Sequence, residues 1–232
     1  MFRRFIQPDS IVLDFGAWIG VTAMYAGHLS RHVYALEPDP VAYEAMAANI
    51  YVNPYLHDRV NIDHGCIATE TRPMEFFLLN GGGSSGSSLT KGSGQSVIVD
   101  CYTLKDWAID KGLSQIDFIK IDTEGAEEVL IPQIQPYLMS LPHMPHMWLS
   151  VHVPYWTDAS KPSAFVTALK GMYPTCYLEA TQTLLDYSKF DEFLSTCGFC
   201  TLMCTPTPFN EIPWDIDLSR KNQGRIFEEV NT

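Results

Sequence analysis

Apolar and polar positions in the first part of the chain predict strands that alternate with helices. Short apolar runs at Ile11–Asp14, His32–Leu36 and Val60–Asp63 have the length and composition of buried strands. Between them, Val21–Ser30 and the segment from about Val41 to Asn49 carry apolar residues at helical spacing. Strands and helices in strict alternation favour a doubly wound, mostly parallel sheet with helices on both faces.

The alternation stops after the third strand. Met74–Leu79 and Ser96–Tyr102 both have strand-like patterns, and no helical pattern lies between them. They are joined through Gly81–Ser88, a run of glycine and serine that is flexible by composition. Two interpretations of this run stay open: a disordered surface loop, or a mobile lid over a pocket.

Further elements follow to the end of the chain. Helices are predicted at Leu104–Lys111, from near Gly125 with an interruption at Pro132, at Pro162–Met172 and at Lys189–Cys197. Strands are predicted at Asp117–Asp122, Met147–His152, Cys176–Ala180 and Phe199–Cys204. Repeats and linkers are not evident, which predicts one domain over 1–232, with a cofactor half at about 10–135 and an acceptor part at about 136–232. The polar residues from about Pro206 are expected to be loosely held.

Composition narrows the classes of partner. The formal net charge of −12 disfavours nucleic acid and anionic membranes. Apolar runs stay well below the roughly 20 residues of a membrane helix, and the N-terminus has no signal-peptide pattern. We therefore expect a cytoplasmic protein.

The six cysteines are scattered along the chain, and in a reducing compartment we expect all of them to be free thiols. Cys197, Cys200 and Cys204 have a spacing that also suits a metal site. Their apolar neighbours favour a buried strand instead, because cysteine is among the most buried residue types.

The segment Val12–Gly20 reads as a strand, a glycine turn and the start of a helix. Its pattern is D-x-G-x-x-x-G, whereas a dinucleotide site needs G-x-G-x-x-G. Asp14 lies two residues before Gly16, where its carboxylate would repel a pyrophosphate. It suits a ligand with an ammonium group and no phosphate, such as S-adenosylmethionine. Glu37 ends the next strand, where a carboxylate accepts hydrogen bonds from ribose hydroxyls.

The sequence resembles the FkbM family of S-adenosylmethionine-dependent methyltransferases. Three segments carry the resemblance, and they follow one another in the family's order: Val12–Gly20, Ala35–Pro38 and Ile116–Glu127. Ile116–Glu127 is the most specific match, because the family carries D-x-x-K-I-D-x-E-G-x-E there. The resemblance covers about 10–135. Many relatives have asparagine at the position of Trp18, which puts the covering of the methionine end in doubt.

The resemblance implies a class I (Rossmann-like) methyltransferase fold with a seven-stranded sheet and S-adenosyl-L-methionine as the cofactor. The residues expected around the cofactor are Asp14, Gly16, Ala17, Trp18, Gly20, Glu37, Pro38, Cys66, Ile67 and Asp122. The acceptor that it implies is a hydroxyl group on a small molecule or a glycan.

Methyl transfer to a hydroxyl needs a group that removes a proton. Asp122, Glu124 and His152 are the candidates, because each follows a predicted strand at its carboxyl end. A divalent metal is the alternative way to relieve the repulsion between the two carboxylates, although we predict none, and a structural role is the alternative for His152. Glu127 and Glu128 are expected only to favour a helix N-terminus.

The sequence therefore predicts an S-adenosylmethionine-dependent methyltransferase. The alternatives are a non-catalytic module that binds the same cofactor and, against the glycine spacing, a nicotinamide-dependent oxidoreductase.

Overall fold

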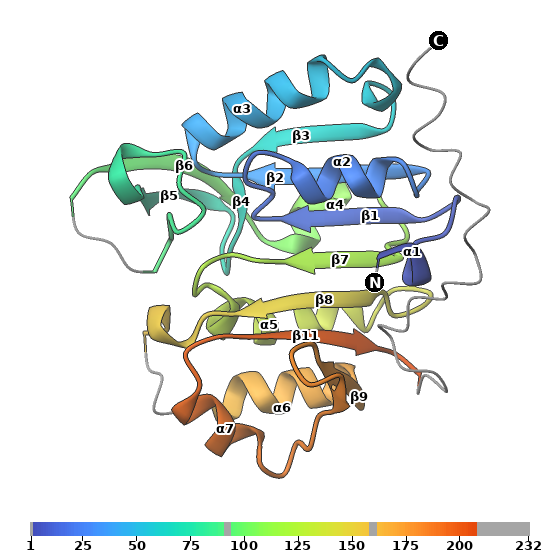
Figure 1. Ribbon diagram of the computed structural model, residues 1–232, viewed down its shortest axis with the longest axis vertical. Helices are drawn as coiled ribbons and strands as arrows, with labels where there is room; N and C mark the ends of the chain where they lie inside the picture. Colours follow the sequence, from blue (N-terminus) through green and yellow to red (C-terminus); the bar gives the residue numbers. More distant parts are fainter. Residues whose placement is uncertain (1, 91–93, 158–161, 208–232) are drawn as a thin grey trace.

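The computed structural model describes residues 2–90, 94–157 and 162–207 and contains one eight-stranded sheet and one three-stranded sheet (Figure 1). The strands are β1 (Ile11–Phe15), β2 (His32–Glu37), β3 (Val60–His64), β4 (Cys66–Ile67), β5 (Arg72–Phe77), β6 (Ser96–Tyr102), β7 (Phe118–Ile121), β8 (His146–Val151), β9 (Thr175–Leu178), β10 (Thr183–Leu184) and β11 (Cys200–Thr205). The α-helices are α1 (Phe2–Phe5), α2 (Val21–Gly27), α3 (Pro40–Tyr51), α4 (Leu104–Asp110), α5 (Glu127–Leu138), α6 (Ser163–Met172) and α7 (Phe190–Thr196).

The large sheet has the strand order β10-β9-β11-β8-β7-β1-β2-β3. Strands β3, β2, β1, β7 and β8 are parallel, whereas β11, β9 and β10 pair in antiparallel fashion. The predicted mostly parallel α/β sheet is confirmed. The expected count of seven strands is one short, because β10 is a two-residue, exposed strand paired with β9 and is too short to leave a periodic pattern.

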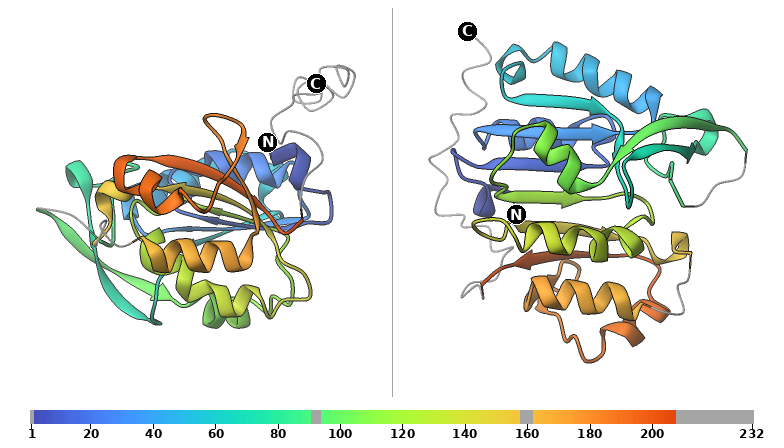
Figure 2. Two further views of the ribbon diagram at one scale, coloured as in Figure 1. Left: turned by 90° about the horizontal axis from the view of Figure 1, so that it is seen from below. Right: turned by 180° about the vertical axis from the view of Figure 1, so that it is seen from behind.

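The connectivity creates a switch point beside β1. From β1 the chain builds outwards through β2 and β3, and then returns to place β7 on the other side of β1. Open α/β sheets bind ligands at the carboxyl ends of the strands next to such a point. Helix α2 lies in front of the sheet in Figure 1, and the view from behind in Figure 2 shows α4, α5 and α6 on the other face.

The small sheet extends past the carboxyl ends of the parallel strands (Figure 1). Its order is β4-β6-β5, and β5 and β6 are antiparallel. Two neighbouring strands were predicted here, and both are confirmed; among the described residues between them, the structure has one short 3-10 helix, Leu79–Gly81, and no α-helix. The first begins and ends two residues earlier than expected, at Arg72–Phe77.

Helix α5 does not stop at Pro132, so the predicted interruption is wrong. The helix continues through both Pro132 and Pro136 to Leu138. Proline removes a backbone donor and typically costs about 3 kcal/mol inside a helix. Here Leu130, Ile131 and Ile134 are buried in the main core, and this packing outweighs the loss.

Two of the six cysteines are not free thiols, which corrects that expectation. Cys66 and Cys101 form a disulfide, because β4 and β6 place them as register partners with their Cα atoms 4.8 Å apart. The other four are free. Cys200 and Cys204 lie on β11, whose residues are all buried, in agreement with the predicted buried strand.

Within the described ranges, no helix has both the length and the apolar character needed to cross a membrane. The expectation that the chain is loosely held from about Pro206 falls mostly outside the described residues, which end at Thr207.

Candidate active site

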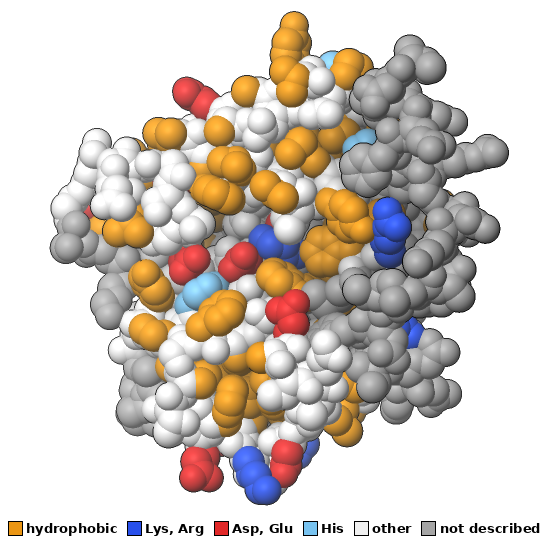
Figure 3. Space-filling view, in the orientation of Figure 1, with side chains coloured by type: hydrophobic (Ala, Val, Ile, Leu, Met, Phe, Trp, Pro, Cys, Tyr) orange, Lys and Arg blue, Asp and Glu red, His pale blue; other side chains and the backbone are white. Residues whose placement is uncertain are grey.

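A cavity opens at the carboxyl ends of β1, β2 and β7. It contains about 860 Å³ of space between protein atoms, part of it open to solvent. Figure 3 shows acidic side chains, a histidine and a basic side chain gathered near the middle of this face. The walls come from the turn after β1, the ends of β2 and β7, strand β4 and the glycine–serine run.

The turn after β1 has a backbone that only glycine adopts easily at two positions. Gly16 has φ 73°, and a Cβ atom there would collide with the carbonyl oxygen of Asp122. Gly20 has φ 86° and stands at the N-terminus of α2. The turn therefore brings bare backbone against the chain directly after β7.

Glu37 is a buried carboxylate on the cavity wall. Its side chain accepts a hydrogen bond from the Trp18 N–H at 2.7 Å and another from the Asp39 N–H at 2.8 Å. Burial raises the pKa of Glu37 to about 7, although these two hydrogen bonds act to lower it. Both carboxylate oxygens keep lone pairs that a hydroxyl donor can reach.

Asp39 joins the β2 end to the glycine–serine run. Its Oδ1 accepts from the N–H groups of Val41 and Ala42 and so caps α3. Its Oδ2 accepts from the Gly83 N–H at 2.8 Å and from the Ser87 hydroxyl at 2.9 Å. One buried carboxylate therefore fixes both a helix and the loop.

The glycine–serine run is ordered against the cavity. Trp18 Nε1 donates to the Gly83 carbonyl at 2.9 Å, and the Ser88 hydroxyl donates to the Glu124 carbonyl at 2.6 Å. Ser84 and Ser85 line the cavity. These contacts place the run over the cavity, as the lid interpretation expects, and its mobility stays a prediction.

Asp14 lies below the cavity and does not line it. It is 2% exposed, its Oδ1 lies 3.0 Å from Lys120 Nζ, and its Oδ2 accepts from the Thr22 hydroxyl at 2.5 Å. Lys120 also donates to the Gly16 carbonyl at 2.8 Å. Burial lowers the pKa of Lys120, but Asp14 and Asp122 together raise it above its ordinary value. The predicted contact of Asp14 with the cofactor's ammonium group stays a prediction.

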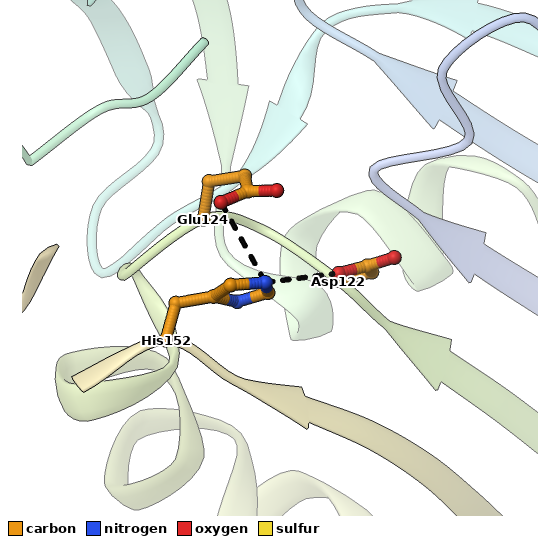
Figure 4. A group of neighbouring side chains, drawn as sticks. All are labelled: Asp122, Glu124 and His152. Atoms are coloured by element: carbon orange, nitrogen blue, oxygen red, sulfur yellow. Dashed lines mark ion pairs between the residues drawn. The ribbon is translucent and has the colours of Figure 1, made fainter. Parts of the chain in front are cut away.

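Asp122, Glu124 and His152 come together beside the cavity (Figure 4). His152 Nε2 lies 3.7 Å from Asp122 Oδ1 and 3.6 Å from Glu124 Oε2. Burial lowers the pKa of His152, whereas Glu127, Glu124 and Asp122 raise it, and the net shift is upward. Burial also raises the pKa of Glu124. The arrangement can take a proton on the imidazole and stabilise the resulting charge.

Glu127 belongs to this cluster as well, although only a helix-terminal role was expected for it. It is completely buried, and its Oε1 lies 3.3 Å from His152 Nδ1. It begins α5, as expected, but its side chain turns inward to the imidazole instead of to solvent.

The predicted site residues divide into two groups. Those on the cavity wall are Gly16, Ala17, Trp18, Glu37, Pro38, Cys66, Ile67, Asp122 and Glu124. Asp14 and Gly20 lie behind the wall, and His152 contacts it through Asp122 and Glu124.

Sequence reasoning missed Lys120, Thr22 and Glu127. The signal for Lys120 was present, because it is the single charged residue of the buried strand Phe118–Ile121. Glu127 is the last acid of the motif that the sequence matches, but its contact with His152 depends on tertiary packing, as does the contact of Thr22 with Asp14.

Among the described residues, one group of three side chains has ligand atoms close enough to hold a metal ion. The group is Asp122, Glu124 and His152, whose ligand atoms lie within 4.8 Å of one another. The sequence predicts no resident metal, and that stays a prediction.

One comparison with known proteins shows the family of this chain. The sequence model of the methyltransferase FkbM domain matches residues 14–146, more than half of the chain. The chain is 27% identical over 143 residues to the 2-O-methyltransferase NoeI of Sinorhizobium fredii, covering 54% of this chain and 57% of that protein. It is 38% identical over 53 residues to an uncharacterized protein of Methanocaldococcus jannaschii, MJ1452, covering 23% of this chain and 20% of that protein.

The chain thus covers less than two thirds of the length of these curated relatives. Among solved structures, it resembles a methyltransferase FkbM from Methylobacillus flagellatus KT with a TM-score of 0.52 and 15% identity. That match covers 85% of this chain and 44% of the other. At this identity the likeness supports the fold.

Proposed function

Because the chain belongs to the FkbM methyltransferase family, we propose that it transfers a methyl group from S-adenosyl-L-methionine to a hydroxyl group on a small molecule or glycan. One observation carries the proposal. A single cavity has Glu37 at the end of β2 and the pair Asp122 and Glu124 after β7, on either side of β1. We call these the β2 side (Glu37, Pro38, Asp39) and the β7 side (Asp122, Glu124, His152).

The β2 side and the apolar residues next to it on the cavity wall fit the nucleoside part of this cofactor. Glu37 offers buried acceptor oxygens to the ribose hydroxyls. Leu36, Ile67 and Phe76 give an apolar wall of the kind that an adenine ring needs. Lys120, a basic side chain on the wall, is held by Asp14, so it does not offer a free charge to a phosphate.

The β7 side fits the acceptor. When bound, the cofactor supplies an activated methyl group on a sulfonium. Asp122 and Glu124 line the cavity and can orient a hydroxyl group, and His152 next to them can take its proton. A hydroxyl acceptor is also what the name of the relative NoeI, a 2-O-methyltransferase, describes for that protein. The net charge of −12 disfavours nucleic acid or an anionic membrane as the substrate.

The test combines binding with turnover. Calorimetry with S-adenosylhomocysteine and with NAD should give binding to the first alone, and a labelled methyl group should move to some member of a panel of sugars and small alcohols. Binding of NAD alone would indicate an oxidoreductase. Binding of S-adenosylhomocysteine with no transfer to any acceptor would favour a non-catalytic module. Turnover that survives EDTA would agree with the absence of a required metal.

A further inference from the structure

We infer that Glu127 is a positioning residue that fixes the His152 imidazole with its Nε2 atom free to accept the proton of the acceptor hydroxyl. The inference rests on the proposed function. It assigns a role to a carboxylate that neither lines the cavity nor contacts solvent.

The carboxylate of Glu127 is surrounded by hydrogen-bond donors. Its Oε1 accepts from the Thr123 N–H and hydroxyl, both at 3.1 Å. The Gly125 N–H lies 3.2 Å from Oε1 and 3.1 Å from Oε2. The His152 N–H donates to Oε2 at 3.4 Å. A buried carboxylate with this set of partners has a fixed position, because each oxygen is held from more than one direction.

This fixed carboxylate selects one form of the imidazole. His152 Nδ1 lies 3.3 Å from Glu127 Oε1, and a carboxylate oxygen only accepts. Nδ1 therefore carries the hydrogen in the neutral ring, and Nε2 keeps its lone pair. Nε2 is the atom that faces Asp122 and Glu124, both of which line the cavity (Figure 4).

Glu127 also shapes the turn that carries the other two acids. Its bonds to Thr123 and Gly125 hold the backbone on either side of Glu124, which has a left-handed φ of 51°. The ring and the turn are thus positioned by one side chain. A plain helix-terminal role would not require the contact with the ring.

The proton balance of the step is complete. The O–H bond of the acceptor breaks, and its oxygen forms the bond to the methyl carbon. The electron pair of the broken carbon–sulfur bond stays on sulfur, which leaves as a neutral thioether. The proton moves to Nε2 of His152, and the imidazolium that results faces Glu127, Asp122 and Glu124.

The test does not need the identity of the acceptor. In protein labelled with ¹⁵N at histidine, the His152 signals, assigned with His152→Gln, report the tautomer and the titration of the ring. We expect the Nδ1–H tautomer in the wild type. We expect Glu127→Gln to lower the apparent pKa of His152 by about one unit or more, because one unit equals the loss of about 1.4 kcal/mol of interaction with the charged ring.

The matched control is Glu128→Gln. Glu128 lies in the same first turn of α5 but bonds to Thr157, away from His152. It should leave the tautomer and titration of His152 unchanged. The other groups that face the cluster are Lys120, Tyr155 and Cys200, which are the same in both variants.

Three outcomes would overturn the inference. The first is the Nε2–H tautomer in the wild type, a result that holds even if a variant fails to fold. The second is an unchanged His152 titration in folded Glu127→Gln. The third is a shift of the Nε2 signal on adding Mg²⁺ or Zn²⁺, which would make the ring a metal ligand.

Calorimetry with S-adenosylhomocysteine on the same samples distinguishes a failure of this inference from a failure of the proposed function. Glu127→Gln should bind S-adenosylhomocysteine within about twofold of wild type.

Once an acceptor is known, the same variant should lower kcat while KM for the cofactor changes little. The ascending limb of the pH–kcat profile should move to lower pH, and Glu127→Asp should restore part of kcat. A merely structural loss would reduce activity without moving that limb.

Discussion

The β2 side and the β7 side of the cavity are built on different principles. On the β2 side, Glu37 is held by two backbone N–H groups and forms no ion pair with another residue of the described ranges. On the β7 side, Asp122, Glu124 and His152 form a network of charged groups in which Lys120 also takes part. Backbone donors fix a group without titrating, whereas charged side chains change their interactions when a proton moves. The comparison teaches that one side is suited to holding a ligand and the other to exchanging protons.

The largest effect should come from the β7 side. We expect Asp122→Asn to reduce turnover by about 10²–10⁴-fold, the usual range for a group that assists proton transfer. Affinity for S-adenosylhomocysteine should stay within about threefold. Turnover with the acceptor from the labelled-methyl assay and calorimetry measure the two quantities. Asp110→Asn, an exposed acid outside the site, is the control. Equal losses of turnover and affinity would move Asp122 to the cofactor and break the comparison.

The second largest effect should come from the buried ion pair between Lys120 and Asp14. Lys120→Met leaves Asp14 buried without its partner and should lower the free energy of unfolding by about 3–5 kcal/mol. Urea unfolding measures the loss. The double variant Lys120→Met with Asp14→Asn should recover part of it, because the uncompensated charge is gone. If the single variant unfolded at the wild-type urea midpoint, the pair would not be a structural element of the site.

A smaller effect is expected on the β2 side. Glu37→Gln should weaken binding of S-adenosylhomocysteine by about 1–3 kcal/mol, the cost of losing hydrogen bonds to a charged acceptor. Calorimetry measures it, and turnover at saturating cofactor should change little. Unchanged affinity would remove Glu37 from the ribose site.

The smallest effect is a pH dependence of cofactor affinity, which should come from Glu37 on the β2 side. The ionised carboxylate of Glu37 is the form expected to accept from both ribose hydroxyls. Burial raises the pKa of Glu37 to about 7, so below this pH the carboxyl group has to lose its proton before it binds the ribose in this way. Affinity should therefore fall about tenfold for each pH unit below 7 in the wild type and stay flat in Glu37→Gln. Without ligand the sign is opposite: the folded state holds a proton that the unfolded state has released above 4.5, so stability falls as pH rises towards 7. A wild-type affinity that does not change with pH would contradict this.

Local sequence patterns predicted the β2 side and the neighbouring glycine turn well. The glycine turn, Glu37 and the proline that opens α3 are close in sequence, and their roles follow from backbone geometry and strand ends. The pairing of Asp14 with Lys120 was out of reach, because it depends on the register of β1 against β7, in which these two residues are direct partners. The parallel sheet was predictable, but not which strand residues face each other.

The same limit explains the other misses. Glu127 and His152 are 25 residues apart and meet only because α5 packs beside the end of β8. Cys66 and Cys101 are register partners of two strands that are not neighbours in sequence. Pro132 has a strong local tendency to end a helix, and burial of the apolar face of α5 overrode it.

The bonds of Asp39 have a consequence for the kinetics of cofactor exchange. The Gly83 N–H and the Ser87 hydroxyl both donate to its Oδ2 atom. Swinging the loop away would break two hydrogen bonds to a charged acceptor, each worth roughly 1.5–3 kcal/mol. The loop's own hydrogen bonds therefore oppose its opening. Association and release should both be limited by rare openings, which makes exchange slow in each direction without making the equilibrium affinity any tighter.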